Sequence, residues 1–216
     1  MKIIIFGDSI TYGKRDPDGW RVHHLRMRID TEHNIPKQEN IQVYNLWIPW
    51  ELSITMLKRF ENELIRRIEV KEWKQEKSIV IIAVWINDAN GSNRVSDQKT
   101  DTKIFQKNIQ TLIKEAKKYT NQISILGLTP INEEKLHARR SEHKIGSFLN
   151  TDISHYNDLI QEVTQSQEVP FIDIFSSLIK DKWFMNDMTD GIHPWSLWHQ
   201  KLYTTINQHI VDTYNI

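Results

Sequence analysis

The chain has no cysteine among its 216 residues. Disulfide bonds, thiolate catalysis and metal sites with cysteine ligands are therefore excluded. Long hydrophobic runs are also missing, and no apolar segment approaches the length of a membrane-spanning helix. The first apolar run, residues 3–6, is too short for a signal peptide. We therefore expect a cytoplasmic protein that does not insert into a membrane.

Neither sign of charge is in excess, because 28 lysine and arginine residues balance 28 aspartate and glutamate residues. This balance gives no electrostatic basis for binding nucleic acid or an anionic membrane surface. The length suits one domain with a core of ordinary size. No repeat, low-complexity tract or linker divides the chain, so we expect residues 1–216 to form a single domain. The sequence leaves the oligomeric state open.

Strand-like and helix-like segments alternate about five times along the chain. The alternation predicts a parallel sheet with helices on both faces. The strand-like segments are short, apolar and rich in β-branched residues, as in buried parallel strands, and they lie at residues 2–6, 41–46, 78–85, 122–128 and 170–174.

Two helix starts and one long loop can also be placed from the sequence. Ser53 is a candidate N-cap, and a second helix is expected to start at Asp101; each is followed by apolar residues at helical spacing. The charged face of the helix after Ser53 is expected to be solvated. Residues 131–147 are polar and irregular, which is typical of a surface loop, and a lid over a pocket is the alternative.

Three polar turns after the predicted strands carry groups suited to acyl transfer. Ser9 follows the first strand, and Asn87 follows the third. Asp190 and His193 lie three residues apart before the last helix, close enough for a carboxylate to orient an imidazole. Turns that follow parallel strands meet at one edge of the sheet. Serine, aspartate and histidine are the set that nucleophilic catalysis on an ester requires, although no Gly-x-Ser-x-Gly elbow is present.

These motifs resemble those of the SGNH, or GDSL, hydrolases over nearly the whole chain. Residues 7–13 (GDSITYG), Asn87-Asp88 and residues 190–194 (DGIHP) are similar to the first, third and last blocks of that family. The resemblance implies a flavodoxin-like three-layer α/β/α sandwich with a five-stranded parallel sheet. It also implies ester hydrolysis by a triad of Ser9, His193 and Asp190, without a metal or any other cofactor.

The chain departs from the family pattern at two glycine positions. Trp50 occupies the position of a glycine whose backbone N–H donates to the oxyanion, and Trp85 replaces the first glycine of the third block. Every residue except proline retains the backbone N–H, although glycine tolerates dihedral angles that tryptophan does not. The oxyanion hole that the resemblance implies thus consists of Ser9, Asn87 and Trp50.

Tryptophan is abundant, and four of the eight lie in or beside the predicted site loops: Trp47, Trp50, Trp85 and Trp195. Each one alone is explained by ordinary packing. As a group they suggest an aromatic-walled pocket that narrows the acyl site or stacks on a sugar or an aromatic alcohol. We therefore expect a small-molecule ester as substrate, with a small acyl group such as acetyl.

Two other functions agree with part of the pattern. A binding protein that kept the fold and lost efficient turnover would explain the two replaced glycines, although it would not need to retain all four polar site residues. A flavodoxin-like binder of phosphate or flavin would need a loop rich in glycine or serine after the first strand. Asp8 would repel a phosphate in that loop.

Overall fold

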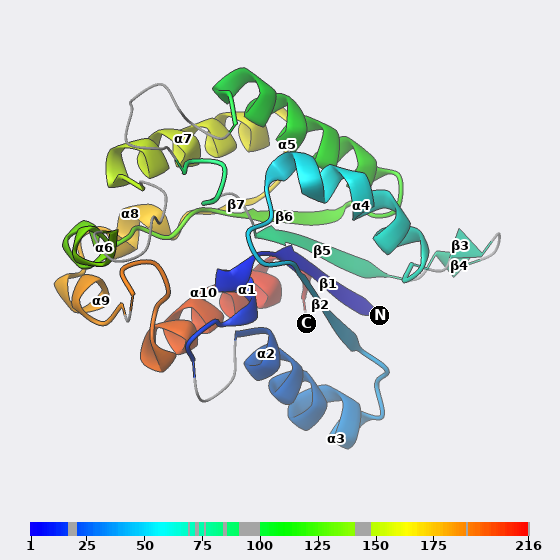
Figure 1. Ribbon diagram of the computed structural model, residues 1–216. Coiled ribbons are helices and arrows are strands. Elements are labelled where there is room, and N and C mark those ends of the chain that lie inside the picture. The colour runs from blue at the N-terminus through cyan, green and yellow to red at the C-terminus, as the bar shows by residue number, and fades with distance from the viewer. Residues whose placement is uncertain are drawn as a thin grey trace.

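Five parallel strands form the central sheet of the computed structural model, in the order β2-β1-β5-β6-β7 (Figure 1). The strands are β1 (Lys2–Gly7), β2 (Gln42–Trp47), β5 (Ser78–Ala83), β6 (Gln122–Leu126) and β7 (Phe171–Ile172). The structure describes residues 1–16, 21–68, 70–71, 74–75, 77–83, 86–90, 100–140, 148–188 and 190–215. The predicted parallel five-stranded sheet is thereby confirmed.

Helices cover both faces of this sheet. α4 (Ser53–Ile65), α5 (Thr102–Lys117) and α7 (Asn150–Ser166) lie on one face, and α2 (Arg21–Ile29) and α10 (Ser196–Tyr214) lie on the other (Figure 1). Successive strand residues point to opposite faces, so Ile4 and Phe6 pack under α4 and α5, while Ile3 and Ile5 pack against α2 and α10. This alternation explains why β1 is apolar throughout.

The register of the strands determines where the chain leaves the sheet. Gly7, the last residue of β1, is level with Trp47 of β2 on one side and with Ala83 of β5 on the other. β2 pairs with one side of β1, and the next strand of this sheet along the chain, β5, pairs with the other side of β1. The carboxyl ends of β1 and β5 therefore form the switch point at which open α/β sheets bind their ligands.

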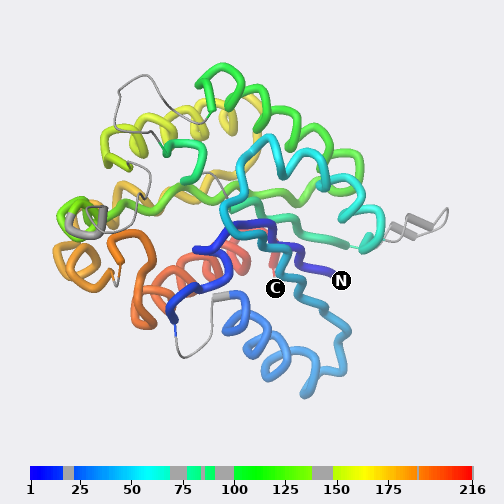
Figure 2. Tube along the Cα trace, viewed as in Figure 1, coloured from blue at the N-terminus to red at the C-terminus, as the bar shows by residue number. Residues whose placement is uncertain are grey.

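Shorter elements complete the fold. α1 (Ser9–Tyr12) follows β1 directly, and α6 (Glu133–Arg140), α8 (Phe175–Leu178) and α9 (Lys182–Asn186) gather at the carboxyl end of the sheet (Figure 2). The π-helical turn η1 (Asp30–Asn34) and α3 (Ile35–Lys37) continue α2, and β3 (Val70–Lys71) pairs with β4 (Lys74–Gln75) in an antiparallel hairpin. Among the described residues, no helix is both long and apolar enough to cross a membrane.

The two predicted helix starts have different outcomes. The helix expected at Asp101 is α5, and the Asp101 carboxylate caps it by accepting hydrogen bonds from the backbone N–H groups of Lys103 and Ile104. The prediction for Ser53 is wrong. Leu52 occupies the N-cap position of α4, and the Ser53 hydroxyl donates instead to the Asp88 carboxylate. A hydroxyl at the first helical position is free to serve a tertiary contact, since the cap is the preceding residue.

The prediction of an irregular loop over residues 131–147 is also wrong for its first half. Residues 133–140 form α6, whose first turn is held by a hydrogen bond of 3.0 Å from Lys135 N–H to the Asn132 side chain. Leu136 of this helix is buried in the core between the helices and the sheet. Residues 141–147 lie outside the described part of the chain, and so the lid hypothesis is not addressed.

Candidate active site

Ser9 occupies the first turn of α1 at the carboxyl end of β1. Gly7 permits this sharp exit, because a Cβ atom at its position would lie 1.9 Å from Thr11 Oγ1. Asp8 is the N-cap and accepts a hydrogen bond of 2.9 Å from Ile10 N–H. Since Asp8 provides the cap, the Ser9 hydroxyl is available for another partner.

That partner is His193, which lies 184 positions further along the chain. Ser9 Oγ is 2.9 Å from His193 Nε2, and His193 Nδ1 is 2.8 Å from Asp190 Oδ2. The structure thus brings together the three residues that the sequence motifs predict as a triad. When Nδ1–H donates to the carboxylate, Nε2 is left as an acceptor for the serine O–H. This arrangement has the geometry needed to activate a serine as a nucleophile.

The turn between Asp190 and His193 holds the carboxylate in place. Asp190 Oδ1 accepts backbone hydrogen bonds from Ile192 (3.1 Å) and His193 (2.8 Å). Gly191 has a φ of +87°, and a Cβ atom there would lie 2.9 Å from the carbonyl oxygen of Asn132. Only glycine meets both demands, the left-handed backbone and the close approach of α6.

The Asp190 carboxyl is held in its charged form. Burial favours the neutral acid, but the hydrogen bond and charge of His193 and the two backbone N–H groups outweigh it and keep the pKa of Asp190 well below its usual value. A group whose pKa is lower in the folded state stabilises the fold above its unfolded pKa, and this stabilisation is lost as the pH falls through the folded value. The carboxylate is therefore ionised at neutral pH.

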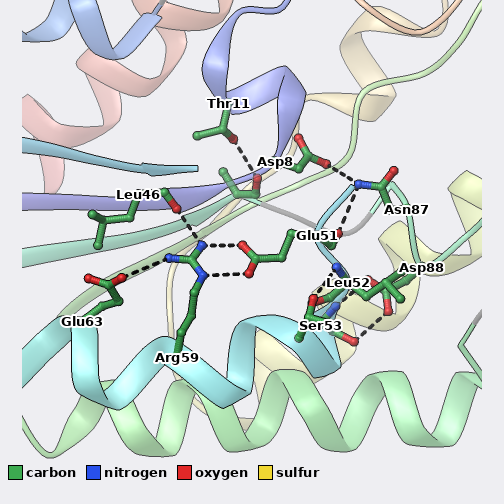
Figure 3. A network of polar contacts seen from close by, with 12 residues as sticks. Asp8, Thr11, Leu46, Glu51, Leu52, Ser53, Arg59, Glu63, Asn87 and Asp88 are labelled. Carbon is green, nitrogen blue, oxygen red and sulfur yellow. Dashed lines mark hydrogen bonds and ion pairs between the residues drawn. The ribbon is translucent and has the colours of Figure 1, made fainter. Parts of the chain in front are cut away.

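Asn87 lies beside Asp8, at the carboxyl end of β1. Its side-chain amide donates to Asp8 Oδ2 at 3.2 Å and to the carbonyl oxygen of Glu51 at 3.1 Å (Figure 3). Both hydrogen atoms of the amide are thus directed at acceptors. An oxyanion could receive a hydrogen bond from Asn87 only by sharing or displacing one of these two acceptors.

Trp50 adopts the backbone conformation of a glycine. Its φ is +60°, in the left-handed region that L-residues adopt at a cost of about 1–2 kcal/mol. Its ring is half-exposed, and Lys14 Nζ lies 6.0 Å from the ring centroid. The position therefore keeps its glycine-like backbone geometry, although the residue is a tryptophan.

A buried polar network that the sequence did not reveal supports the turn after Trp50. The Arg59 guanidinium binds both carboxylate oxygens of Glu51 and the carbonyl oxygen of Leu46 (Figure 3). Only 1% of the Glu51 side chain and 16% of the Arg59 side chain are exposed. The expectation that the charged face of α4 is solvated is therefore wrong at Arg59. Helical spacing shows which residues share a face of α4. It does not show that the turn before α4 places the buried Glu51 carboxylate against that face.

Burial raises the pKa of the Glu51 carboxyl, and the hydrogen bonds and charge of Arg59 act in the opposite direction.

A second part of the network lies nearby, where Asp88 accepts hydrogen bonds from Ser53 N (2.8 Å) and Ser53 Oγ (2.7 Å). Asn87 lies between the two parts, since it bonds Glu51 and precedes Asp88. The network therefore holds Asn87 through its own side chain and through the neighbouring Asp88.

The predicted tryptophan wall is only partly assembled. The Trp47 ring stacks on Tyr12, with centroids 4.0 Å apart and an interplanar angle of 27°. This pair lines an open groove of about 490 Å³, together with Arg15. Trp195, with 42% of its surface exposed, precedes α10. Trp85 lies outside the described residues, so its place in the site is not addressed.

Comparisons with known proteins agree with this geometry. A family model described as "GDSL-like Lipase/Acylhydrolase family" matches residues 5–201. No curated protein sequence matches the chain. Among solved structures, a lipase/acylhydrolase from Enterococcus faecalis is similar, with a TM-score of 0.70 and 21% identity over 97% of this chain and 94% of that one.

Two similar structures carry a more specific description. An acetylxylan esterase from Geobacillus stearothermophilus has a TM-score of 0.71 and 16% identity, and covers 97% of this chain and 93% of that one. Another acetyl xylan esterase has a TM-score of 0.70 and 18% identity, with 97% and 100% covered. At these identities the likeness establishes a shared fold.

Proposed function

The chain belongs to the GDSL-like lipase/acylhydrolase family and is a hydrolase that acts on esters, and we propose that it is a serine esterase that removes a small acyl group through an acyl-enzyme on Ser9. The observation that carries the proposal is the pair of short contacts that link Ser9 to His193 and His193 to Asp190. A buried, ionised Asp190 beside the imidazole supports the same assignment.

In the proposed first step, Ser9 Oγ forms a bond to the carbonyl carbon of the ester while its proton passes to His193 Nε2. The carbonyl π electrons move to the oxygen, which becomes an oxyanion. When the tetrahedral intermediate collapses, the bond to the alcohol oxygen breaks and His193 returns the proton to that oxygen. Asp190 orients the imidazole and stabilises its charged form during the step.

Deacylation repeats these steps with water. His193 accepts a proton from a water molecule as the water oxygen attacks the acyl carbon, and the proton then passes to Ser9 Oγ as the carboxylic acid is released. We assign the oxyanion donors to the backbone N–H of Ser9, the side-chain amide of Asn87 and the backbone N–H of Trp50. The positive φ of Trp50 supports its assignment, since a glycine-like backbone persists there at an energetic cost.

The Asn87 assignment leads to a prediction for Asn87→Ala. We expect kcat to fall by about 10²–10³-fold, the usual effect of removing one oxyanion donor. The folded state should also lose about 1–3 kcal/mol, because Asp8 and the Glu51 carbonyl group would each lose a donor. Steady-state hydrolysis of a small ester and thermal unfolding would measure the two effects.

Asn108→Ala is the matched control for that variant. Asn108 is also a buried asparagine, and it donates to Ser53 Oγ at 2.9 Å, away from the proposed reacting groups. It should lose stability to a similar extent and retain kcat within a few-fold of the parent protein. Equal losses of kcat in the two variants would mean that Asn87 acts through the fold and not on the oxyanion.

The proposed substrate is an ester with a short acyl chain on a sugar-like or aromatic alcohol. The stacked pair of Tyr12 and Trp47 at the open groove supports an aromatic or carbohydrate alcohol, because ring faces pack on both. Two of the similar structures are described as acetylxylan esterases, which supports the same class.

Esters of increasing acyl length on one alcohol test this substrate class. We expect kcat/KM to be highest for acetyl and to fall by about tenfold or more for each added methylene, as a small pocket discriminates by size. A matched series of alcohols on a fixed acetyl group tests the groove separately. A preference for long acyl chains would rule out the small-acyl proposal and leave the hydrolase assignment intact.

Labelling with a fluorophosphonate probe is the direct test of the nucleophile. We expect stoichiometric labelling of the parent protein, and none of Ser9→Ala or His193→Ala, with circular dichroism to confirm that the variants are folded. Labelling that survives in Ser9→Ala would place the reactive group elsewhere. A folded parent protein that neither labels nor hydrolyses acetyl esters would favour the alternative of a binding protein on this fold.

A further inference from the structure

The segment that follows α1, residues 13–16, contacts the loop of the proposed triad at two points. Arg15 Nε donates to Asp190 Oδ2 at 2.9 Å, across 175 positions of the chain. Next to it, Ser196 Oγ donates to Asp16 Oδ1 at 2.6 Å and connects the same segment to the first turn of α10. The nucleophile side of the site is thus joined to the Asp190–His193 side by more than the Ser9–His193 contact.

The backbone of this segment is strained and tied to Ser9. Lys14 N–H donates to the Ser9 carbonyl oxygen at 3.0 Å, and Asp16 N–H donates to Gly13 O at 3.0 Å. Arg15 has a φ of +73°, in the left-handed region, although it is not a glycine. An L-residue keeps such a conformation only where its surroundings hold it, and such outliers gather at functional sites. The hydrogen bond from the Arg15 side chain to Asp190 adds to the backbone contacts that hold this conformation.

Arg15 and His193 share one oxygen atom of Asp190. Oδ2 accepts from His193 Nδ1 at 2.8 Å and from Arg15 Nε at 2.9 Å, while Oδ1 accepts two backbone N–H groups. A carboxylate has about four acceptor sites, so these contacts occupy them. Without the guanidinium, one site on the oxygen that faces the imidazole would be left to water.

We propose that Arg15 is a positioning residue of the triad, which fixes the Asp190 carboxylate against His193 and shapes the pH profile of the reaction through its charge. The inference rests on the proposed function of the triad. The first part follows from the hydrogen bond, because a planar donor on a shared oxygen restricts rotation of the carboxylate. The second follows from charge, because a guanidinium beside the pair disfavours a second positive charge at the same place.

The neighbouring charged groups are already bonded to other partners, so Arg15 is the cation that the test addresses. Asp8 and Asp16 bond to backbone or uncharged side-chain groups, and Lys135 of α6 reaches two backbone carbonyl groups near the triad loop. These contacts are Asp8 with Ile10 N and Asn87, Asp16 with Ser196, and Lys135 with the carbonyl oxygens of Asn186 and Met188.

The experiment compares the pH dependence of kcat/KM for a small acetyl ester in Arg15→Met, Arg15→Lys and the parent protein. For Arg15→Met we expect the acidic limb to move to higher pH by about half a unit, since solvent screens a cation that is partly exposed. At neutral pH, kcat should fall by about tenfold, because the carboxylate loses a charged hydrogen-bond partner. The effect on Asp190 is measured in kcat, because Arg15 also lines the groove proposed for the alcohol and its loss there would change KM.

Arg15→Lys separates charge from geometry. It should restore the position of the acidic limb but only part of kcat, because an ammonium lacks the planar donor. Arg66→Met is the matched control, since Arg66 is an exposed arginine at the end of α4 and does not line the proposed substrate groove. Its pH profile should superimpose on that of the parent protein.

Two failures are distinguishable. If the parent protein labels with a fluorophosphonate and Arg15→Met keeps its kcat and its acidic limb, the inference about Arg15 is overturned and the triad stands. If the parent protein does not label, the proposed function fails, and Arg15 with it. A fall in kcat with no movement of the acidic limb, and no recovery in Arg15→Lys, would reduce Arg15 to a purely structural contact.

Discussion

Ester hydrolysis should fall by about 10⁶-fold in Ser9→Ala, to the level that binding and the oxyanion donors provide without a nucleophile. The Ser9 hydroxyl contacts His193 at 2.9 Å, and no other group is proposed to attack the acyl carbon. Asp190→Asn should lower kcat by about 10⁴-fold, because an amide would favour the wrong tautomer of the imidazole. Single-turnover and steady-state hydrolysis of an acetyl ester would measure both.

The combined variant makes this prediction sharper. Residues that act as one unit are not additive, so Ser9→Ala with His193→Ala should lose no more activity than Ser9→Ala alone. Ser166→Ala provides a control for removal of a hydroxyl, since Ser166 ends α7 and its hydroxyl donates to the Val163 carbonyl group of the same helix. Substantial hydrolysis by folded Ser9→Ala protein would refute the proposed acyl-enzyme.

The second large effect is expected on stability, in Arg59→Met. Arg59 binds both oxygens of Glu51, one of them at 2.7 Å, and the carbonyl group of Leu46. Removing one partner of a buried ion pair leaves the other charge unpaired, which destabilises a protein by about 3–5 kcal/mol. That is a large part of the 5–15 kcal/mol of a typical domain. Thermal unfolding at pH 8 should show a decrease in Tm of roughly 10 °C.

The effect should depend on pH, with a sign that the burial of Glu51 determines. Burial raises the pKa of Glu51, and Arg59 opposes that rise. Without Arg59 the folded-state pKa should rise further above its unfolded value. A group of this kind stabilises the fold below its unfolded pKa, and this stabilisation is lost as the pH rises through the folded value. The difference in Tm between the parent protein and Arg59→Met should therefore narrow from pH 8 to pH 5.

A double-mutant cycle distinguishes the ion pair from simple loss of packing. Glu51→Gln added to Arg59→Met should recover part of the lost stability, because it removes the unpaired charge. Arg66→Met, an exposed arginine at the end of the same helix, should leave Tm nearly unchanged. A loss in Arg59→Met that is equal at both pH values and is not relieved by Glu51→Gln would contradict the role given to the buried pair.

The Glu51–Arg59 pair also explains how the site tolerates Trp50. The buried carboxylate directly after Trp50 is anchored to α4, and the Glu51 carbonyl group accepts a hydrogen bond from Asn87. A turn fixed on its carboxyl side can hold a tryptophan at a φ of +60°, where glycine would be the relaxed choice. The tryptophan at this glycine position of the family pattern is thus accommodated by a left-handed backbone, which the Glu51–Arg59 ion pair holds in place.

Much of the fold and the core of the site could be predicted from the sequence, because the information is local. Apolar runs such as residues 2–6 and 78–83 give the parallel strands, and the strand ends place Ser9 and Asn87 at one edge of the sheet. The Asp190–His193 spacing is short enough for one turn to bring the two side chains together. Hydrophobic period and short motifs do not depend on the conformation of distant loops.

Other features were decided only in the tertiary structure. The sequence does not indicate that Arg15 reaches Asp190, that Arg59 pairs with Glu51, or that Ser53 bonds Asp88 instead of capping its helix. Each of these contacts joins a charged or polar side chain to a group on another element, and such side chains look alike in the sequence whether they are solvated or buried. The order of the strands in the sheet determines which turns lie next to one another. A carboxylate that becomes buried between such turns must then form an ion pair or hydrogen bonds there, because a buried charge is stable only when it is paired.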